Sequence, residues 1–290
     1  MNYQDFCNIL NKHIFGSGKK DLLRKIAKNP ERFIGLFRPT KPTGKILQHI
    51  FQSREIRMGD AFEEIIEEII KSIGFTILPK NIGSTGKKKL LLDQYFMKDN
   101  MYYFIEQKLR DDHDSSKKVG QMKNFESKLK ILVGIHGSNN LFGIMYFIDP
   151  DIRKNENYYR KELEKLSKSY KVELYLFYGK DLFDYLACNN LWNDILSWMR
   201  QWKENLSELP QINFDETPDE SFDEIKNLEL RYWKKILEND QLWYEGIIKT
   251  IFRSGETLKR ILNHFCSKQS DLQYKELWNL LQKRIEEYYK

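Results

Sequence analysis

Apolar and polar positions follow two different periods along this chain, and the changes of period mark its predicted elements. Between residues 59 and 73 apolar side chains recur every three or four positions, with glutamates opposite them, which predicts an amphipathic helix that ends at Gly74. Apolar runs at 75–78, 90–97 and 101–110 predict three strands. Further along, the pattern predicts a helix, a strand, a helix and a strand, at 114–132, 141–148, 156–169 and 172–178. This order predicts an α/β fold in which helices flank a central mixed sheet.

Helical patterns also lie on both sides of this α/β region. Residues 2–56 contain short helical stretches that glycine and proline interrupt, most clearly at 38–44. From residue 180 onward the pattern is helical again, and the acidic, proline-bearing segment 213–220 has the composition of a link. We therefore expect three parts, which are an N-terminal helical segment at 1–57, an α/β core at 58–188 and a helical C-terminal region at 189–290.

Composition narrows the class of protein. The cysteines Cys7, Cys188 and Cys266 are odd in number and lack any Cys-x-x-Cys spacing, which argues against a zinc ribbon or a disulfide framework. No apolar run approaches the ~20 residues of a membrane span, and the N-terminus lacks the features of a signal peptide. We expect a soluble cytoplasmic protein with no membrane partner. Its formal net charge of +6 is compatible with a polyanionic partner.

One predicted hairpin brings charged residues together. Residues 99–100 are Asp-Asn, a pair that favours a two-residue hairpin turn. Counting outward from that turn places Asp93 opposite Glu106, and opposed residues lie about 5 Å apart at Cβ. Lys108 projects on the same face as Glu106, because side chains alternate across a strand. Two carboxylates and one ammonium are thus predicted to converge.

These residue types in this arrangement suit metal-assisted cleavage of a phosphodiester. Asp93 and Glu106 would bind Mg²⁺, a hard cation that prefers oxygen ligands, and the backbone carbonyl of Gln107 would supply a further one. The metal would polarise the scissile phosphate and lower the pKa of a bound water. Lys108 would orient the attacking water or help deprotonate it, and it would offset the charge of the transition state.

Several alternatives stay open at this point. Glu63 or Glu67 of the preceding helix would reach the metal as an outer ligand, or both belong to a solvated helix face. Lys108 would instead form a surface ion pair at a strand end. The acid-x-lysine triplet is common in this chain, since 126–128 and 224–226 have the same form in helical stretches. Only the predicted register distinguishes the triplet that ends in Lys108.

Basic and polar side chains bracket the carboxylate pair and suit contacts to phosphates or base edges. The run 111–118 also admits a His/Asp metal site of its own, although its composition favours a turn followed by a helix cap at Asp114 or Ser115. The candidate DNA-binding residues are Lys87, Lys88, Lys89, Arg110, His113, Ser115, Ser116, Lys117, Lys118, Gln121 and Lys123.

Other catalytic motifs fail on inspection. Residues 83–88 contain two glycines and two lysines but lack the spacing and the closing Ser or Thr of a P-loop. No Gly-x-Ser-x-Gly elbow is present, and no cysteine has a histidine at a recognisable interval. The sequence therefore supports neither an ATP site nor a covalent hydrolase.

The triad of Asp93, Glu106 and Lys108, within this order of elements, resembles the PD-(D/E)xK nuclease superfamily over about residues 58–150. Leu92 stands where the family often has proline. Chain length, the helical C-terminal part and the segment 230–235 are similar to type II restriction endonucleases of the HindIII kind.

This resemblance implies a restriction-endonuclease-like core and a homodimer that cuts both strands of double-stranded DNA at a short palindromic site. It also implies Mg²⁺ as cofactor and a cognate methyltransferase that is a functional rather than a physical partner. Two alternatives stay open, which are a structure-specific or repair nuclease of the same fold and a non-catalytic DNA-binding protein.

Overall fold

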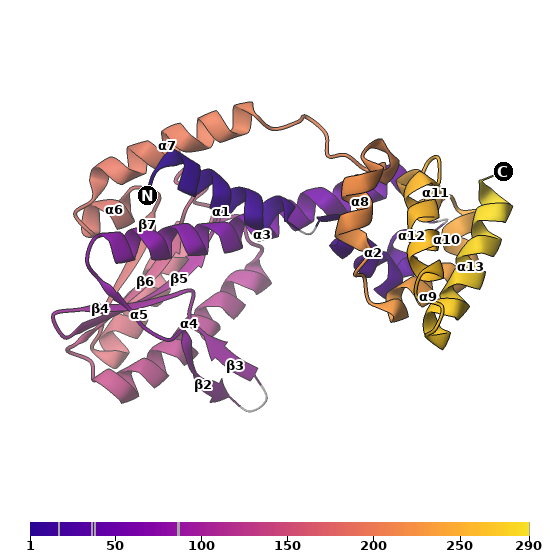
Figure 1. Ribbon diagram of the computed structural model, residues 1–290. Helices are drawn as coiled ribbons and strands as arrows, with labels where there is room; N and C mark the ends of the chain where they lie inside the picture. Colours follow the sequence, from indigo (N-terminus) through magenta and orange to yellow (C-terminus); the bar gives the residue numbers. More distant parts are fainter. Residues whose placement is uncertain (17, 36, 38, 86–87, 290) are drawn as a thin grey trace. The chain divides into compact units, whose positions relative to one another are not determined.

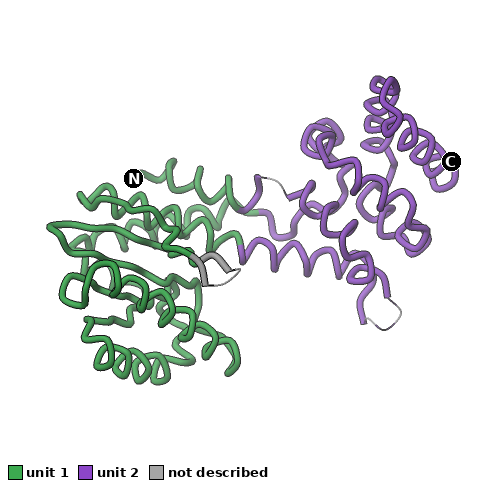
Figure 2. Tube along the Cα trace, turned by 90° about the horizontal axis from the view of Figure 1, so that it is seen from below, with its two compact units in different colours: residues 1–13, 57–206 green, residues 14–56, 207–290 purple. Residues whose placement is uncertain are grey.

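The chain forms two units, which Figure 2 shows in different colours. Unit 1 contains residues 1–13 and 57–206, and unit 2 contains residues 14–56 and 207–290. The computed structural model describes all residues except 17, 36, 38, 86–87 and 290, and it leaves the side chains of 84–85 and 88–89 undescribed. None of the helices in the described part of the chain has the length and apolar character needed to cross a membrane.

A five-stranded mixed sheet forms the centre of unit 1 (Figure 1). The strand order is β1-β4-β5-β6-β7; β1, β4 and β5 are antiparallel neighbours, whereas β5, β6 and β7 run parallel. This arrangement confirms the predicted mixed sheet flanked by helices. The strands are β1 (Thr76–Ile77), β4 (Gln94–Lys98), β5 (Met101–Lys108), β6 (Leu141–Phe147) and β7 (Glu173–Tyr178).

Helices cover both faces of this sheet (Figure 1), and aromatic contacts join a helix to a strand on one face and helices to one another on the other. On one face Phe104 of β5 meets Phe125 of α4 at 5.0 Å between ring centroids. On the other face Phe6 of α1 packs edge-on against Phe62 of α3 at 6.3 Å and contacts Trp198 of α7. The helices of unit 1 are α1 (Tyr3–Phe15), α3 (Pro42–Ser72, from Arg57 on), α4 (Ser115–His136), α5 (Glu156–Tyr170), α6 (Asp181–Tyr185) and α7 (Asn189–Glu204).

The predicted hairpin turn is present between β4 and β5. Asp99 and Asn100 both have left-handed backbone conformations, with φ of 51° and 59°, as a tight two-residue turn requires. Lys98 pairs with Met101, and the register continues to the pair of Gln94 with Ile105. The next residues outward are Asp93 and Glu106, so the predicted register is confirmed.

The strand predicted over 90–97 is wrong, because the chain forms two strands there. β3 (Lys88–Leu91) pairs with β2 (Asn81–Thr85) in a separate two-stranded sheet, and β4 begins at Gln94. The break has a local cause. The Leu92 amide donates to the carbonyl of Lys80 at 2.9 Å, whereas the Asp93 side chain takes up an amide of β5. Asp93 thus lies at a junction between two sheets.

Unit 2 is helical and has its own apolar core. Trp233, Ile236 and Phe265 are buried there together with Leu23 and Ile26 of the N-terminal segment. The elements of this unit are α2 (Gly18–Lys28), η1 (Pro30–Arg32), the start of α3, η2 (Phe214–Glu216), α8 (Pro218–Ile225), α9 (Leu230–Glu238), α10 (Asp240–Tyr244), α11 (Ile247–Ile251), α12 (Glu256–Cys266) and α13 (Leu272–Tyr288).

The boundary predicted at 57 lies within one residue of a change of unit, which falls between residues 56 and 57, whereas the chain stays in unit 1 at 188 and changes unit after residues 13 and 206 instead. α1 and the segment 189–206 pack into unit 1, whereas 14–56 joins the C-terminal helices, because their apolar faces are buried there. The helix predicted from 59 begins at Pro42 and runs through Gly44. The supposed link 213–220 is also structured, since Phe214 is fully buried and Pro218 opens α8.

Candidate active site

Asp93, Glu106 and Lys108 converge at the start of β4 and the end of β5. The Lys108 ammonium lies 3.0 Å from Oδ2 of Asp93 and 3.1 Å from Oε1 of Glu106. The side chains are 16% exposed for Asp93, 5% for Glu106 and 28% for Lys108. Lys108 therefore forms ion pairs in a largely buried cluster, which differs from the solvated surface pair considered above.

The backbone of Gln107 joins the same cluster. Its amide donates to Oδ2 of Asp93 at 2.7 Å, and its carbonyl accepts from Nζ of Lys108 at 2.6 Å. The Gln107 side chain points to the opposite face of the sheet, where it meets the Gln94 amide. The carbonyl of Gln107 thus belongs to the charged site, whereas its side chain lies on the face of the sheet that α3 covers.

The sequence interpretation missed a second lysine. Nζ of Lys128, on α4, contacts Oε2 of Glu106, and the Lys128 side chain is only 4% exposed. Asn124, one turn earlier, approaches Oε1 of Glu106 at 3.4 Å. The sequence did contain a signal for this residue. Lys128 lies in the apolar stripe of its helix between Phe125 and Leu129, and a charged residue at such a position requires a partner.

The charges of this cluster shift the pKa values of Asp93, Glu106 and Lys108. Burial and the neighbouring Glu106 carboxylate raise the pKa of Asp93. For Glu106, burial acts in the same direction, but Lys108 and Lys128 outweigh it and lower its pKa. For Lys108, burial would lower the pKa, but the two carboxylates outweigh it and raise the value. Glu106 therefore stays ionised and Lys108 stays protonated, while Asp93 binds protons more readily than a solvated aspartate.

The two glutamates proposed from the preceding helix have different surroundings. Glu67 pairs with Lys80 at 2.7 Å, and hydrogen bonds to lysines lower its pKa against the effect of burial. Burial, followed by the charge of Asp93, raises the pKa of Glu63 to about 7. The Glu63 carbonyl also accepts from the Gln94 side chain at 2.7 Å, which ties α3 to β4. Of the two, Glu63 is the one whose pKa is raised by the charge of Asp93.

The oxygen donors of this cluster fit Mg²⁺. The site offers two carboxylates and the Gln107 carbonyl, which are the hard ligands that this ion prefers beside water. Among the described residues, no three His, Cys, Asp or Glu side chains are grouped closely enough to hold a metal by themselves. The carbonyl and water molecules would therefore complete the coordination of an ion here.

The separate His/Asp metal site considered for 111–118 does not form in the described residues. Asp111 is fully buried and accepts hydrogen bonds from Asn155 and from the Tyr178 hydroxyl at 3.0 Å. Asp114 is the N-cap of α4 and accepts from the amide of Lys117 at 2.9 Å, as the composition predicted. Both aspartates thus hold the chain between β5 and α4.

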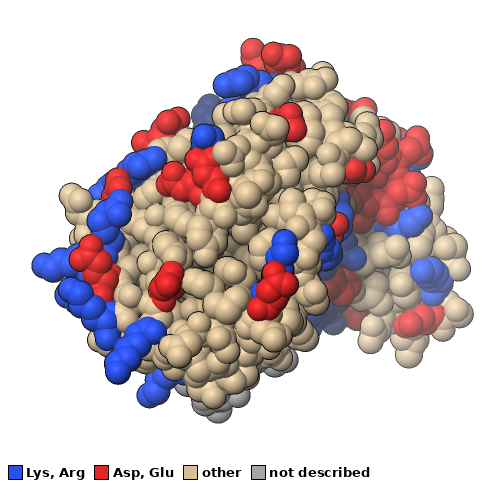
Figure 3. Space-filling model, turned by 90° about the vertical axis from the view of Figure 1, so that its left-hand side faces the viewer, with Lys and Arg blue, Asp and Glu red and all other residues tan. Residues whose placement is uncertain are grey.

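The candidate DNA-binding residues fall into four groups. Ser115, Lys117 and Lys123 are exposed on α4, whereas Arg110 and His113 are half-buried. Three others make internal hydrogen bonds, which join Ser116 to Asp114, Lys118 to Asn155 and Gln121 to Tyr159. Lys87 lies outside the described residues, and the side chains of Lys88 and Lys89 are undescribed. In the face shown in Figure 3, Lys and Arg, with some Asp and Glu among them, gather along one margin beside an area that carries few charged groups.

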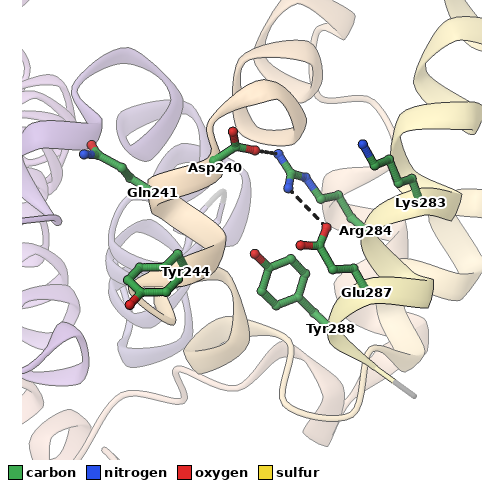
Figure 4. A pocket seen from close by; sticks show the side chains of 7 residues that line it. All are labelled: Asp240, Gln241, Tyr244, Lys283, Arg284, Glu287 and Tyr288. Carbon is green, nitrogen blue, oxygen red and sulfur yellow. Dashed lines mark hydrogen bonds and ion pairs between the residues drawn. The ribbon is translucent and has the colours of Figure 1, made fainter.

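A cavity of about 460 Å³ lies in unit 2 (Figure 4), and none of the residues that line it belongs to the carboxylate-lysine cluster of unit 1. Arg284 lies beside it, and its guanidinium is already bonded to the Leu237 carbonyl, to Asp240 and to Glu287. Its charge is therefore compensated within the unit, and the cavity offers no chemistry of the kind found around Glu106. The lining residues are Asp240, Gln241, Tyr244, Lys283, Arg284, Glu287 and Tyr288.

Comparison with known proteins gives one finding. A family model described as "Type II restriction endonuclease, HinfI" matches residues 2–85 and 75–203, which is more than half of the chain. The searches of curated proteins and of solved structures gave no match. The matched residues contain the whole sheet and the carboxylate-lysine cluster, and they end before the C-terminal helices of unit 2. The match confirms the resemblance to type II restriction endonucleases.

Proposed function

The chain belongs to the HinfI family of type II restriction endonucleases and is a nuclease, and we propose that it cuts both strands of double-stranded DNA at a short palindromic site with Mg²⁺ as cofactor. The observation that carries this proposal is the position of Lys108 between Asp93 and Glu106, at 3.0 and 3.1 Å. Family membership supports DNA as substrate, and the oxygen donors support Mg²⁺.

The proposed ligands are Asp93, Oε1 of Glu106 and the Gln107 carbonyl. When bound, Mg²⁺ supplies Lewis-acid polarisation of the scissile phosphate and makes water a stronger nucleophile at neutral pH. Glu63 is the preferred outer ligand, because Glu67 is already committed to Lys80. Its pKa of about 7 allows Glu63 to exist in both protonation states near neutral pH.

Lys108 acts on the reacting groups as a cation. Because its two carboxylate partners raise its pKa, Lys108 keeps its proton and is a poor base. Its ammonium instead donates hydrogen bonds that orient the attacking water, and its charge offsets the negative charge that develops on the phosphate. Of the two roles considered for Lys108 from the sequence, orientation of the water is therefore the one we propose.

We assign DNA contacts to exposed residues in the first half of α4 and to Lys87, Lys88 and Lys89. Ser115, Lys117 and Lys123 offer donors to the phosphate backbone, and Gln121 suits base edges if it exchanges its Tyr159 contact for DNA. A palindromic site requires two copies of the catalytic cluster, so we propose a homodimer. Such an enzyme would act in the cytoplasm alongside a methyltransferase that protects the same sites.

Digestion of phage DNA tests the proposal. Purified protein with Mg²⁺ should give discrete bands whose sequenced ends define one site, and chelation with EDTA should abolish them. Cleavage confined to junctions or damaged DNA would indicate a structure-specific nuclease instead. Metal-independent DNA binding without cleavage by Mg²⁺ or Mn²⁺ would indicate a non-catalytic DNA-binding protein.

A further inference from the structure

The two carboxylate oxygens of Glu106 have different neighbours. Oε2 contacts the ammonium of Lys128. Oε1 faces Lys108 at 3.1 Å and Asn124 at 3.4 Å, on the side where Asp93 lies. The carboxylate is therefore held in one orientation, with Oε2 on the Lys128 ammonium and Oε1 turned toward the proposed cation position.

The two lysines differ in their freedom to leave Glu106. Lys108 is 28% exposed and has Asp93 and the Gln107 carbonyl as further partners, so it can shift when a cation approaches Oε1. Lys128 is 4% exposed, and Glu106 is the one ion-pair partner that the described residues give it. Moving Lys128 away would leave a buried ammonium unpaired, which is strongly unfavourable. Lys128 therefore stays on Oε2 while Lys108 gives way.

We propose that Lys128 is a positioning residue that restricts Glu106 to one-oxygen coordination and thereby favours Mg²⁺ over Ca²⁺. This inference rests on the proposed function, because it needs Glu106 as a metal ligand. Mg²⁺ is small, keeps several waters and binds few protein ligands in an octahedron, whereas Ca²⁺ takes six to eight oxygens and readily accepts a carboxylate through both of them. Because Lys128 holds Oε2, coordination of an ion through both oxygens of Glu106 is blocked.

Metal competition on Lys128→Met tests this role. Methionine keeps most of the side-chain volume but removes the ammonium, so Oε2 becomes free. Mn²⁺ bound to the protein, alone and with duplex DNA, is measured by electron paramagnetic resonance and displaced with Mg²⁺ or Ca²⁺. We expect the Ca²⁺-to-Mg²⁺ affinity ratio to rise about tenfold, and Mg²⁺-dependent cleavage to fall about 10- to 100-fold. Ca²⁺ should also become a stronger inhibitor of cleavage.

Two matched variants separate positioning from a merely structural role. Lys130→Met removes an exposed lysine from the same helix and should keep both the ratio and the cleavage rate of the wild type. Lys128→Arg keeps a cation at Oε2 and should keep the ratio. If Lys128 had only a structural role, Lys128→Met would have a lower melting temperature, and its affinities for Mg²⁺ and Ca²⁺ would fall by the same factor.

An unchanged Ca²⁺-to-Mg²⁺ ratio in folded Lys128→Met overturns the inference. Should that variant fail to fold, Lys128→Leu, which also leaves no hydrogen-bond donor for Oε2, carries the same test, and an unchanged ratio there has the same meaning. Failure of the proposed function has a different signature, namely a wild-type protein that neither binds Mn²⁺ nor cuts DNA with Mg²⁺.

Discussion

Two partly buried aspartates, one in each unit, show how differently this protein uses a carboxylate. Asp215 of unit 2 accepts hydrogen bonds from the amides of Ser254, Gly255 and Thr257, each at 2.8 Å. These neutral donors belong to the start of α12 and the turn before it. Burial would raise the pKa of Asp215, but the hydrogen bonds outweigh it and lower the value.

Asp93 of unit 1 has the opposite balance. It accepts one backbone amide, from Gln107, and shares the Lys108 ammonium with Glu106. Burial and the neighbouring carboxylate raise its pKa. The neutral donors around Asp215 stabilise the fold, whereas Asp93 has one backbone donor and shares the Lys108 ammonium with Glu106, which leaves it able to bind the proposed metal ion. The partners of the two aspartates therefore distinguish a structural acid from the one that we propose to be catalytic, although both are partly buried.

The largest effect should come from breaking the catalytic cluster. Lys108→Ala and Asp93→Ala should each reduce cleavage by about 10²–10³-fold or more, because the charge that forms on the phosphate loses its stabilisation. DNA binding, measured by gel shift without metal, should persist. Lys226→Ala is the matched control, since Lys226 belongs to another acid-x-lysine triplet and pairs with the exposed Asp223. Wild-type cleavage by both cluster variants would refute the site assignment.

Asp215→Ala should lower stability and leave cleavage unchanged, which is the reverse of the effect expected for the cluster variants. Loss of its hydrogen bonds should lower the free energy of unfolding by about 2–3 kcal/mol, while cleavage per folded molecule stays unchanged. Because the folded-state pKa of Asp215 is lowered, its stabilisation is present above the unfolded-state pKa and is lost as the pH falls through the folded-state value. Urea unfolding at neutral and acid pH measures this, and an equal loss at both would contradict the explanation.

Glu63 should give a smaller pH effect of opposite sign. Its pKa is raised from 4.5 to about 7, so the folded state binds more protons than the unfolded state between those values. Stability should therefore fall as the pH rises through that window. Glu63→Gln should flatten the decline by about 1 kcal/mol, since solvent screens part of the shift.

Glu67→Gln is the control for this measurement. The lysines around Glu67 lower its pKa, so its contribution to stability increases as the pH rises and is lost in acid. Unfolding curves at pH 5 and pH 8 compare the two variants. If Glu63→Gln and Glu67→Gln change the free energy of unfolding by the same amount at both pH values, the pKa values of the two glutamates are not shifted in opposite directions.

The smallest effect should come from a residue outside both carboxylate clusters. Lys117 is exposed in the first turn of α4, and its side chain is assigned to a phosphate. Lys117→Ala should weaken DNA binding evenly across sequences and reduce the slope of log affinity against log salt concentration by about 1. Fluorescence anisotropy at several salt concentrations measures that slope. A lower cleavage rate at saturating DNA would instead connect Lys117 to the chemistry.

Local sequence signals determined much of this protein. The Asp99–Asn100 turn fixes the register of β4 and β5 by its own backbone preference, and period-2 alternation then sets the face of Glu106 and Lys108. The Asp114 cap is equally local, because its side chain bonds an amide three residues away. The order of elements, the mixed sheet and the convergence of Asp93, Glu106 and Lys108 could therefore be predicted from the chain alone.

Tertiary structure decided what depends on distant partners. Lys128 ends an acid-x-lysine triplet, as Lys226 of unit 2 does, and only the packing of α4 on the sheet places it against Glu106. The apolar face of α2 likewise does not reveal that its partners are the C-terminal helices. Hydrophobic burial is non-directional, so a sequence shows which faces must be covered but not by which segment. The sequence thus determined the acids and the first lysine of the site, and the fold alone decided the second.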